Sequence, residues 1–369
     1  MSLNKHPKRM VVTDGGAAMS IVIPSVCVEM GQLGSALTRA VRSIEELGYL
    51  RAAHSNLLVF HHDLPPDELG NWIDSLTLVN PSRVFVLSID DSVEGITLDV
   101  GGRCHRVSPS VILCSEVAKV TVPRHRLPEL PSVLRAHMLS GARIEAVILQ
   151  EAIPDWIEQL TGSLAQTVYI DTRVTAGAAQ TVPRFWYRKE RVIDCAWMWL
   201  NPWREVIRQA FDRADLSERL LNLSRVNFTV SHGAGASLLS LLLLPGWIQG
   251  RLGLELREVE GTRVLLGTED GTRSVEFNFV EVDEGRGSVN GMAFFDRSEE
   301  PFLQLRVVNE ILEGQFDEAR SWVPLRRYGG EGSRELLERY FLIGASMTHY
   351  QSSFRNAVRL LEGGALAVQ

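Results

Sequence analysis

Cysteine is scarce in this sequence, and no long apolar segment is present. The chain of 369 residues has four cysteines, and no pair of them has the C-x-x-C spacing of a zinc site or a redox dithiol. The longest apolar run, residues 238–248, contains Pro245 and is far shorter than the roughly 20 residues that cross a bilayer. Neither a metal site nor a membrane span is therefore expected. Mostly buried free thiols are expected at Cys27, Cys104, Cys114 and Cys195.

Basic charge and targeting signals are also sparse. The 38 Lys and Arg residues are outnumbered by 45 Asp and Glu residues, which gives a net charge of −7. Nucleic-acid binding is not expected, because it needs a basic field that displaces the counterions of the phosphates. The basic start, M-S-L-N-K-H-P-K-R-M, is not followed by the uninterrupted apolar core of a signal peptide. We therefore expect a cytoplasmic protein.

No complete catalytic motif is recognisable either. The segment V-S-H-G-A-G-A-S at 230–237 lies between an expected strand and an expected helix, where backbone N–H groups can bind phosphate. It lacks the Gly-Lys-Ser/Thr of a P-loop and the third glycine of a dinucleotide fingerprint. A glycine-rich helix entry explains the segment, and an anion site at Ser231, Gly233, Gly235 and Ser237 is the alternative. We predict no catalytic residues and no cofactor.

Two groups of possible ligands have weaker patterns. In His61-His62-Asp63, adjacent strand residues point to opposite faces, so the two imidazoles cannot both bind one ion. Asp90 follows an expected buried strand, at the end where α/β sheets place ligands. An exposed strand end and a turn are the favoured interpretations. Asp90 and the 231–237 loop nevertheless define an alternative function, an enzyme or sensor that binds a phosphorylated small molecule in a strand-end cleft.

Hydrophobic periodicity divides the chain into two parts of the α/β class. Alternating strand and helix patterns predict an N-terminal mixed α/β sheet domain at 31–171, preceded by a flexible arm at 1–30. The small polar segment that follows predicts a linker at 172–190. The C-terminal domain, 191–369, is expected to be α+β. It would contain an antiparallel meander of short strands at 254–296 and a long terminal helix at 333–361.

The segment 194–211, D-C-A-W-M-W-L-N-P-W-R-E-V-I-R-Q-A-F, contains three of the eight tryptophans. Residues 195–199 resemble a strand, and a helix is expected to begin with Asn201 as its N-cap and Pro202 at its first position. A packed strand-to-helix corner explains the aromatic residues. A partner-binding surface is the alternative, because Trp and Arg are favoured interface anchors. Its candidate residues are Trp197, Trp199, Trp203 and Arg204.

This segment also carries a family resemblance. The run D-C-A-W-M-W-L-N-P-W-R-E resembles the D-L-x-W-x-x-L-x-P-W-R-E stretch of the OpcA family, the bacterial glucose-6-phosphate dehydrogenase assembly proteins. Six further short matches occur in the same order, spread over roughly residues 50 to 253, about half of the chain. They are R-A-A-H-S-N-L-L-V at 51–59, N-P-S-R-V-F-V-L at 80–87, C-S-E at 114–116, L-P-S-V-L-R-A at 130–136, R-V-I-D at 191–194 and L-L-L-P-G-W-I-Q-G-R-L-G at 242–253.

The resemblance implies a function that the residues alone do not indicate. It implies a non-catalytic assembly factor and allosteric activator that binds glucose-6-phosphate dehydrogenase and promotes its active oligomer. Such a protein would support NADPH production by the oxidative pentose phosphate pathway. Its only implied partner is the dehydrogenase, and the tryptophan segment is the expected contact.

Overall fold

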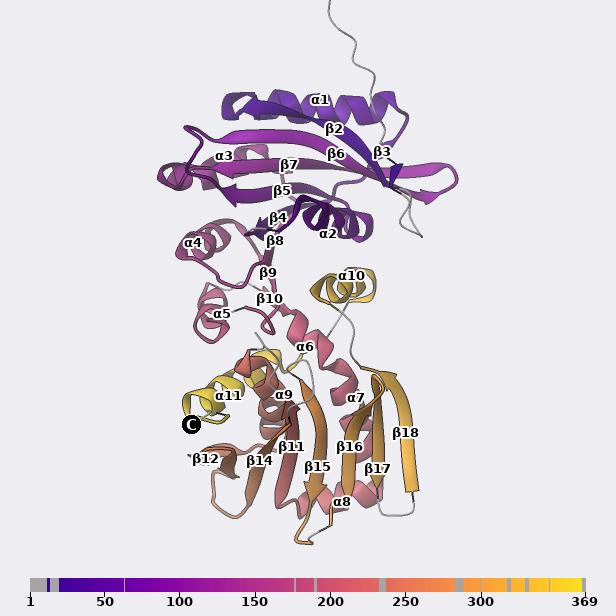
Figure 1. The fold of residues 1–369 in the computed structure, drawn as a ribbon, viewed down its shortest axis with the longest axis vertical. Helices are drawn as coiled ribbons and strands as arrows, with labels where there is room; N and C mark the ends of the chain where they lie inside the picture. The colour runs from indigo at the N-terminus through magenta and orange to yellow at the C-terminus, as the bar shows by residue number, and fades with distance from the viewer. Residues whose placement is uncertain are drawn as a thin grey trace, which may run out of the picture. The chain divides into compact units, whose positions relative to one another are not determined.

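The computed structural model describes two compact units of the chain, each with its own sheet (Figure 1). Unit 1 consists of residues 1–170, 180–193 and 337–344, and unit 2 consists of residues 171–179, 194–336 and 345–369. The mixed α/β fold class predicted from the sequence is confirmed. The described residues are 12–13, 20–62, 64–175, 177–188, 191–231, 237–282, 288–298, 300–316, 320–328, 332–344 and 346–366.

The sheet of unit 1 has ten strands in the order β1-β2-β6-β7-β5-β4-β8-β9-β10, with β3 paired to β7. Its centre is parallel, since β4 pairs in parallel with β5 and β8, and β5 with β7. β4 is buried almost throughout, as expected for a strand covered on both faces. The strands are β1 (Val12–Thr13), β2 (Ser20–Glu29), β3 (Leu50–Arg51), β4 (Ser55–His61), β5 (Ser82–Ile89), β6 (Thr97–Ser108), β7 (Val111–Val122), β8 (Arg143–Leu149), β9 (Thr167–Ile170) and β10 (Arg191–Asp194).

Helices cover this sheet, and α1 lies along β2 and β6 (Figure 1). The α1 side chains that are buried recur with helical spacing, which is why the segment forms an amphipathic helix. The helical elements of the first half of the chain are η1 (Met30–Gln32), α1 (Leu33–Glu46), α2 (Pro66–Val79), η2 (Arg124–Glu129), α3 (Leu130–His137), α4 (Asp155–Leu164) and α5 (Ala178–Tyr187).

Two expected irregular segments contain regular structure. Part of the expected flexible arm forms β2, because alternate apolar residues, Ile21 and Ile23, are buried against the sheet. The expected linker contains α5, whose Val182 and Phe185 are fully buried. In both segments, burial of a few apolar side chains outweighs a composition typical of loops.

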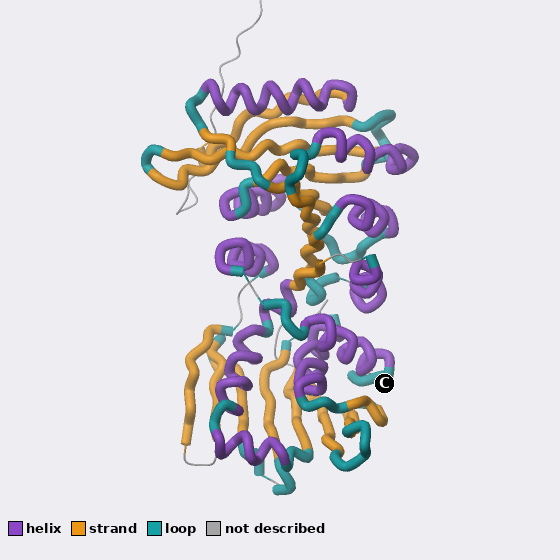
Figure 2. The backbone as a smooth tube through the Cα atoms, turned by 180° about the vertical axis from the view of Figure 1, so that it is seen from behind, coloured by secondary structure: helices purple, strands orange, loops and turns teal. Residues whose placement is uncertain are grey.

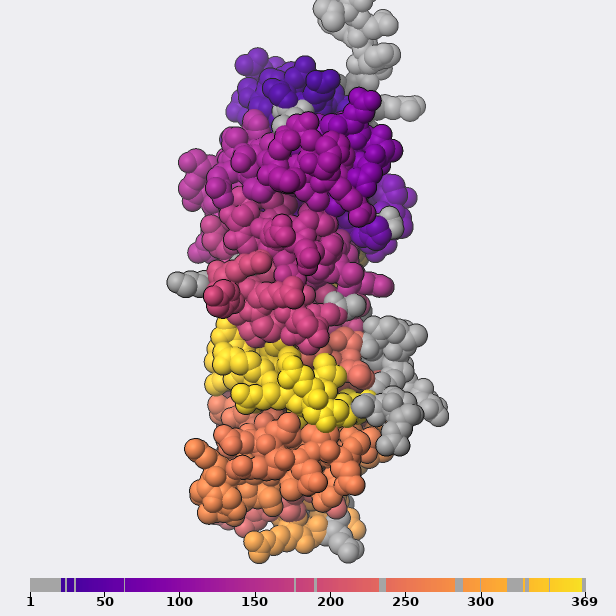
Figure 3. All heavy atoms as spheres, turned by 90° about the vertical axis from the view of Figure 1, so that its left-hand side faces the viewer, coloured from indigo at the N-terminus to yellow at the C-terminus, as the bar shows by residue number. Residues whose placement is uncertain are grey.

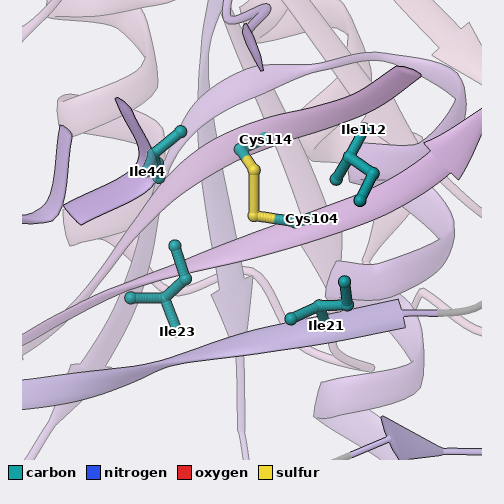
Figure 4. Close-up of a cluster of buried hydrophobic side chains, with 6 residues drawn as sticks. All are labelled: Ile21, Ile23, Ile44, Cys104, Ile112 and Cys114. Atoms are coloured by element: carbon teal, nitrogen blue, oxygen red, sulfur yellow. A yellow bond between two sulfur atoms is a disulfide. The ribbon is translucent and has the colours of Figure 1, made fainter. Parts of the chain in front are cut away.

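The prediction of four free cysteines is wrong for two of them. Cys104 on β6 and Cys114 on β7 lie directly opposite in the antiparallel pair and form a disulfide. Figure 4 shows this bond within a buried cluster that includes Ile21, Ile23 and Ile112. No local pattern in the sequence indicates the pairing, because the two cysteines are brought together only by the β6–β7 register. Cys27 is exposed and free, whereas Cys195 is buried and free.

Three of the motifs that carry the family resemblance meet at one buried carboxylate in unit 1. Glu116 is fully buried and forms ion pairs with Arg51 and with Arg83, the latter at 3.3 Å. Next to Arg83 and Glu116 in sequence, the backbone N–H of Ser82 donates to Ser115 Oγ at 3.1 Å. A buried charge is costly unless it is paired, so these residues depend on one another. Their place in the sheet explains the motifs at 51–59, 80–87 and 114–116 as structural.

The sheet of unit 2 has eight strands in the order β12-β13-β14-β11-β15-β16-β17-β18. Strands β12 to β14 form the start of the antiparallel meander predicted at 254–296, but β11 pairs in parallel with β14 and separates it from β15. The segment 225–231 precedes the meander in sequence and inserts into its middle. The strands are β11 (Arg225–Ser231), β12 (Glu255–Glu260), β13 (Arg263–Gly267), β14 (Ser274–Val282), β15 (Val289–Phe295), β16 (Leu303–Val308), β17 (Ile311–Phe316) and β18 (Arg320–Arg327).

The helices of unit 2 gather on one face of this sheet (Figure 2). Phe211 of α7 packs edge-on against Phe294 of β15, with 5.4 Å between the ring centroids. The strongly apolar α9 is buried almost all round and packs against α11, which lies on the outside of unit 2 in Figure 3. The helices of the second half are α6 (Cys195–Trp199), α7 (Asn201–Phe211), α8 (Ala214–Leu221), α9 (Leu238–Arg251), α10 (Ser333–Ile343) and α11 (Tyr350–Glu362).

The single terminal helix predicted at 333–361 is in fact two helices. Gly344 has φ +72° and His349 has φ 66°, so the backbone leaves the helical region between α10 and α11. The helical pattern of each half is strong, and a glycine that can adopt positive φ ends the first half. None of the described helices is long and apolar enough to span a bilayer.

Candidate functional site

Asp194 is the centre of the candidate site in unit 2. It is the last residue of β10 and the N-cap of α6, where its side chain accepts a hydrogen bond from the backbone N–H of Ala196 at 2.9 Å. Aspartate suits this position, because its carboxylate accepts a hydrogen bond from a free N–H group and its negative charge is stabilised by the positive end of the helix dipole. The expected strand at 195–199 is therefore wrong: this cap and the helix-forming residues after it make the segment helical.

The carboxylate of Asp194 is fully buried and accepts four hydrogen bonds. Besides Ala196, the donors are the N–H and hydroxyl groups of Thr172 and the hydroxyl of Tyr350, which lies 2.8 Å from Oδ2. Burial, and then repulsion by Asp171, raise the pKa of Asp194 to about 6, although the hydrogen bonds oppose this rise. The site thus holds a carboxylate whose charge changes near neutral pH.

A second carboxylate, Asp171, lies just after β9 and is also buried. Arg173 donates to both of its oxygens, at 2.9 Å to Oδ1 and 2.6 Å to Oδ2, and the Ser333 hydroxyl lies 2.5 Å from Oδ2. Desolvation by burial lowers the pKa of Arg173, but the Asp171 contacts outweigh it and the net shift is upward. The Arg173 guanidinium is therefore charged, and its contact with Asp171 is a buried ion pair.

We name Asp171, Thr172, Arg173, Asp194 and Tyr350 the Asp194 cluster. Sequence reasoning missed these residues as a group, although Asp171 directly follows β9 and Asp194 ends the neighbouring strand β10. That spacing was the available signal, since the ends of adjacent strands lie close together. Tyr350 could not have been found in this way, because it is 156 residues from Asp194 in sequence.

The tryptophans that were candidate partner anchors are mostly buried. Trp197 is 1% exposed and Trp203 is 0% exposed, whereas Trp199 is half-buried. The Trp197 indole N–H donates to the backbone oxygen of Ser346 at 3.2 Å. The helix expected to start at Asn201 is present as α7, although its N-cap is Leu200 and Asn201 is its first residue. Trp197 and Trp203 are core residues of unit 2 and do not form an exposed surface.

Arg204 has a structural role that the sequence did not predict. Its guanidinium carbon lies 3.6 Å from the centroid of the Trp197 ring, and its Nη1 donates to the Trp197 carbonyl at 2.6 Å. Burial lowers the pKa of Arg204 to about 9, against the attraction of Glu205, so the group is still charged at neutral pH. A desolvated cation over an indole is a favourable contact.

Trp199 connects the tryptophan segment to the Asp194 cluster. Its ring lies 4.5 Å from that of Tyr328, and the Arg173 guanidinium carbon lies 5.3 Å from its centroid. Trp203 packs edge-on against the same Tyr328, at 5.6 Å. Burial raises the pKa of the Tyr328 hydroxyl, which is therefore neutral at physiological pH. The aromatic residues and the buried charges form one continuous packed region.

The predicted anion site is only partly described. Ser231 is buried at the end of β11, where its N–H donates to the Ser288 carbonyl at 2.9 Å. The N–H of Ser237 donates to the carbonyl of Arg173 at 3.0 Å. Gly233 and Gly235 lie outside the described residues. The backbone donors of both serines already have partners, so binding of a phosphate here stays a prediction.

The other candidate ligands lie apart in unit 1. Asp90 is exposed and accepts a hydrogen bond from the N–H of Ser92 at 2.8 Å, a turn contact that lowers its pKa. His61 ends β4 and His62 follows it, while Asp63 lies outside the described residues. Within the described part of the chain, no group of His, Cys, Asp and Glu is arranged to hold a metal ion. Asp90 therefore acts as a turn residue.

Comparison with known proteins gives one family match. Residues 190–300 match the OpcA family, through a model described as the C-terminal domain of the glucose-6-phosphate dehydrogenase subunit. This range includes Asp194, the tryptophan segment, α9 and the strands from β11 to β15. No curated protein matches the chain.

Solved structures resemble the chain only distantly. A dehydrogenase from Chromobacterium violaceum is 11% identical with a TM-score of 0.46, covering 85% of this chain and 94% of that one. An oxidoreductase from Sinorhizobium meliloti is 9% identical with a TM-score of 0.48, covering 85% and 98%. Biliverdin reductase from Synechocystis is 8% identical with a TM-score of 0.42, covering 85% and 98%. The family match at residues 190–300 is thus the informative comparison, and it shows that this part of the chain is similar to the C-terminal domain that the OpcA family model describes.

Proposed function

We propose that this protein is a non-catalytic assembly factor that binds glucose-6-phosphate dehydrogenase and promotes its active oligomer. The observation that carries the proposal is the match of residues 190–300 to the domain named for that enzyme. The sequence motifs at 51–59, 80–87 and 130–136 support it outside the matched range. In the cell the complex would act in the cytoplasm and raise NADPH production by the oxidative pentose phosphate pathway.

Activation by such a factor is a population shift. A protein that binds the active oligomer more tightly than the inactive form moves the equilibrium by its difference in affinity and by no more. A tenfold shift in the population of active oligomer requires a difference of about 1.4 kcal/mol, which a few contacts can supply. No chemical step by this chain is needed.

The tryptophan segment is the proposed contact, with a division of roles that follows from burial. The buried Trp197 and Trp203 would fix the corner between α6 and α7, and the half-buried Trp199 and Arg204 would border the contact surface. Arg208 lies on the exposed side of α7, where it pairs with Asp212 at 3.0 Å. We propose that this exposed rim touches the dehydrogenase while the tryptophans beneath keep it in shape.

An NADPH-formation assay with the dehydrogenase of the same organism tests the proposal. The chain alone should not reduce NADP⁺ with glucose 6-phosphate, and adding it to the dehydrogenase should raise the rate to a plateau. Arg208→Glu should raise the concentration of the chain needed for half-maximal activation by tenfold or more. The matched control is Arg257→Glu on β12, an exposed arginine of the same unit outside the segment. Equal effects of the two variants would move the contact elsewhere, and no activation by the wild-type chain would contradict the proposed function.

A further inference from the structure

The eight-stranded sheet of unit 2 has one face that no described helix covers. Helices α7, α8, α9 and α11 lie on the opposite face, where the inward side chains are apolar, mostly valine, phenylalanine and leucine (Figures 1 and 2). The strands alternate strictly: Val226, Phe228 and Val230 of β11 are buried, while Asn227 and Thr229 between them are half-buried. We call the uncovered side the open face. It includes Asn227, Thr229, Asn278, Val280, Gly291, Ala293, Gln304, Arg306, Glu313 and Gln315.

A trough follows β15 along the centre of the open face. The residues of β15 on this side are small, Gly291 and Ala293, and they lie opposite Thr229 and Asn227 of β11. A Cβ atom added at Gly291 would come within 3.2 Å of Thr229 Oγ1, so a larger residue would not fit without displacement. The hollow above these residues has a volume of about 350 Å³.

A ridge runs beside the trough, on β16. Gln304 and Arg306 are exposed there, opposite Ala293 and Gly291 in the strand register. On the far side of the ridge, Arg306 pairs with Glu313 of β17 at 3.7 Å. The charges on this part of the face are thus paired within it.

The chemistry of the face matches a copy of itself. Its central polar side chains are mostly amides, and one of them already bonds another: Asn278 Nδ2 donates to Asn227 Oδ1 at 3.3 Å. An amide both donates and accepts, so it can pair with its own kind, whereas a face of one charge sign repels itself. An isologous interface, in which the same patch is used on both copies, requires this property.

We propose that the open face is the interface of a homodimer. A twofold axis that runs along the strands between β15 and β16 sets the ridge of each copy over the trough of the other. The same axis places β17 of one copy over β11 of the other, so that Gln315 faces Asn227 and Thr229. Two sheets that pack face to face at about 10 Å form such an interdigitated layer.

The area of overlap is sufficient for a specific interface. The axis superimposes six strands, from β14 to β18 in sheet order. With a strand spacing of about 4.8 Å and about 3.4 Å per residue, six strands of roughly six residues cover about 580 Å². Both copies together then bury roughly 1,150 Å², above the approximate limit of 1,000 Å² for a specific interface. The inference concerns a second copy of this chain and does not depend on the proposed partner enzyme.

Sedimentation velocity of the full chain by itself, over a range of micromolar concentrations, tests the inference. The wild type should sediment as a dimer, a species with twice the chain mass of 41.1 kDa. Ala293→Arg fills the trough and should raise the dimer dissociation constant at least a hundredfold. Gln304→Glu, at an exposed position, places two like charges beside the axis and should also weaken the dimer if Ala293→Arg does not fold. The control is Leu221→Arg, at an exposed residue that ends α8.

Circular dichroism melting shows whether each variant is folded. Dimeric wild type and Leu221→Arg, together with a folded monomeric Ala293→Arg or Gln304→Glu, would support the interface. A monomeric wild type at all concentrations would overturn it, as would a dimer that both open-face variants retain. A monomer whose Ala293→Arg variant loses dehydrogenase binding would assign the face to that enzyme and would also overturn the homodimer.

Discussion

The guanidinium of Arg204 stacks on the indole of Trp197, 3.6 Å from the ring centroid, and donates a hydrogen bond to the carbonyl of the same residue. One side chain thus joins the start of α7 to α6. The sequence suggested an arginine available to a partner, since a cation in the first turn of a helix opposes the helix dipole. The stacking explains why an arginine is nevertheless present there.

Arg204→Ala should therefore destabilise unit 2. It removes a desolvated cation–π contact and leaves the Trp197 carbonyl without its donor, which together should cost about 2–3 kcal/mol of unfolding free energy. Urea denaturation of wild type and variant measures this loss. Arg208→Ala, on the exposed side of the same helix, is the control and should change stability by less than about 0.5 kcal/mol. Equal stability of Arg204→Ala and wild type would mean that the stacking is not part of the folded core.

Asp194 predicts a particular pH dependence of stability. Its pKa rises from the ordinary 3.8 to about 6, so the folded state holds this proton more tightly than the unfolded chain. The resulting stability is present below about pH 4 and is lost as the pH rises through about 6. Asp194→Asn has the same shape and does not titrate. The stability of the variant relative to wild type should therefore increase between pH 4 and 7, by about 2 kcal/mol.

Denaturant titrations of both proteins at several pH values measure this difference. Asp270→Asn is a suitable control, because hydrogen bonds from Thr268 and Thr272 lower the pKa of the exposed Asp270. Its difference from wild type should not increase over the same range. A stability difference for Asp194→Asn that is independent of pH would show that Asp194 is ionised like any surface aspartate.

Tyr350→Phe should change the same pH dependence of stability. The Tyr350 hydroxyl donates to Asp194 Oδ2, and this hydrogen bond lowers the pKa of Asp194. Without the hydroxyl, the loss of stability with rising pH should shift to higher pH. At pH 7 the variant should be about 1–3 kcal/mol less stable, because a buried acceptor loses its donor. A lower stability with an unchanged pH dependence would mean that the Tyr350 hydroxyl does not influence the pKa of Asp194.

Gly246 of α9 predicts an unusual effect of alanine in a helix. An added Cβ would lie 2.5 Å from the carbonyl oxygen of Ser353 and 2.8 Å from the N–H nitrogen of Ala357, so α11 would have to move. Gly246→Ala should thus destabilise by about 1–3 kcal/mol. Gly70→Ala in α2 is the matched control, because nothing lies within 4 Å of its added Cβ. It should stabilise by about 0.5–1 kcal/mol, the usual preference of helices for alanine. Thermal melts of both variants decide the point.

Thiol labelling should distinguish the four cysteines. Cys27 is exposed and should react promptly with an aromatic disulfide reagent. Burial of Cys195, and then the nearby charges of Asp171 and Asp194, raise the pKa of its thiol well above the ordinary value. Cys195 should therefore react slowly. Cys104 and Cys114 form a disulfide and should not react. Prompt labelling of one thiol in the wild type and none in Cys27→Ser is expected. Prompt labelling of three would mean that the disulfide is absent in solution.

Local patterns predicted the elements of this fold well, whereas long-range contacts were beyond them. The buried strand before Asp90 follows from an apolar run, and the helix that begins at Asn201 follows from its Asn-Pro start. The parallel insertion of β11 depends on pairing between strands that are far apart in sequence, and the disulfide depends on the register of the β6–β7 hairpin. No local signal encodes such pairing.

The candidate site shows the same limit. The tryptophan segment was recognised, but its residues were placed on a strand face because alternation at Cys195, Trp197 and Trp199 resembles a strand. The carboxylate of Asp194 caps the segment through the N–H of Ala196 and so favours a helix instead. Burial of Trp197 and Trp203 likewise depends on partners such as Tyr350 and Tyr328, which are more than a hundred residues away in sequence. That Trp199 and Arg204 border a partner surface stays a prediction.

The proposed assembly function is tested most directly by the oligomeric state of the dehydrogenase in the presence of this protein. Fluorescently labelled glucose-6-phosphate dehydrogenase from the same organism would be sedimented alone and with increasing amounts of the chain, and each fraction assayed for activity. We expect a shift of the dehydrogenase to a larger species that contains both proteins and has a higher specific activity. An unchanged sedimentation profile and unchanged activity across a wide excess of the chain would contradict the proposed function.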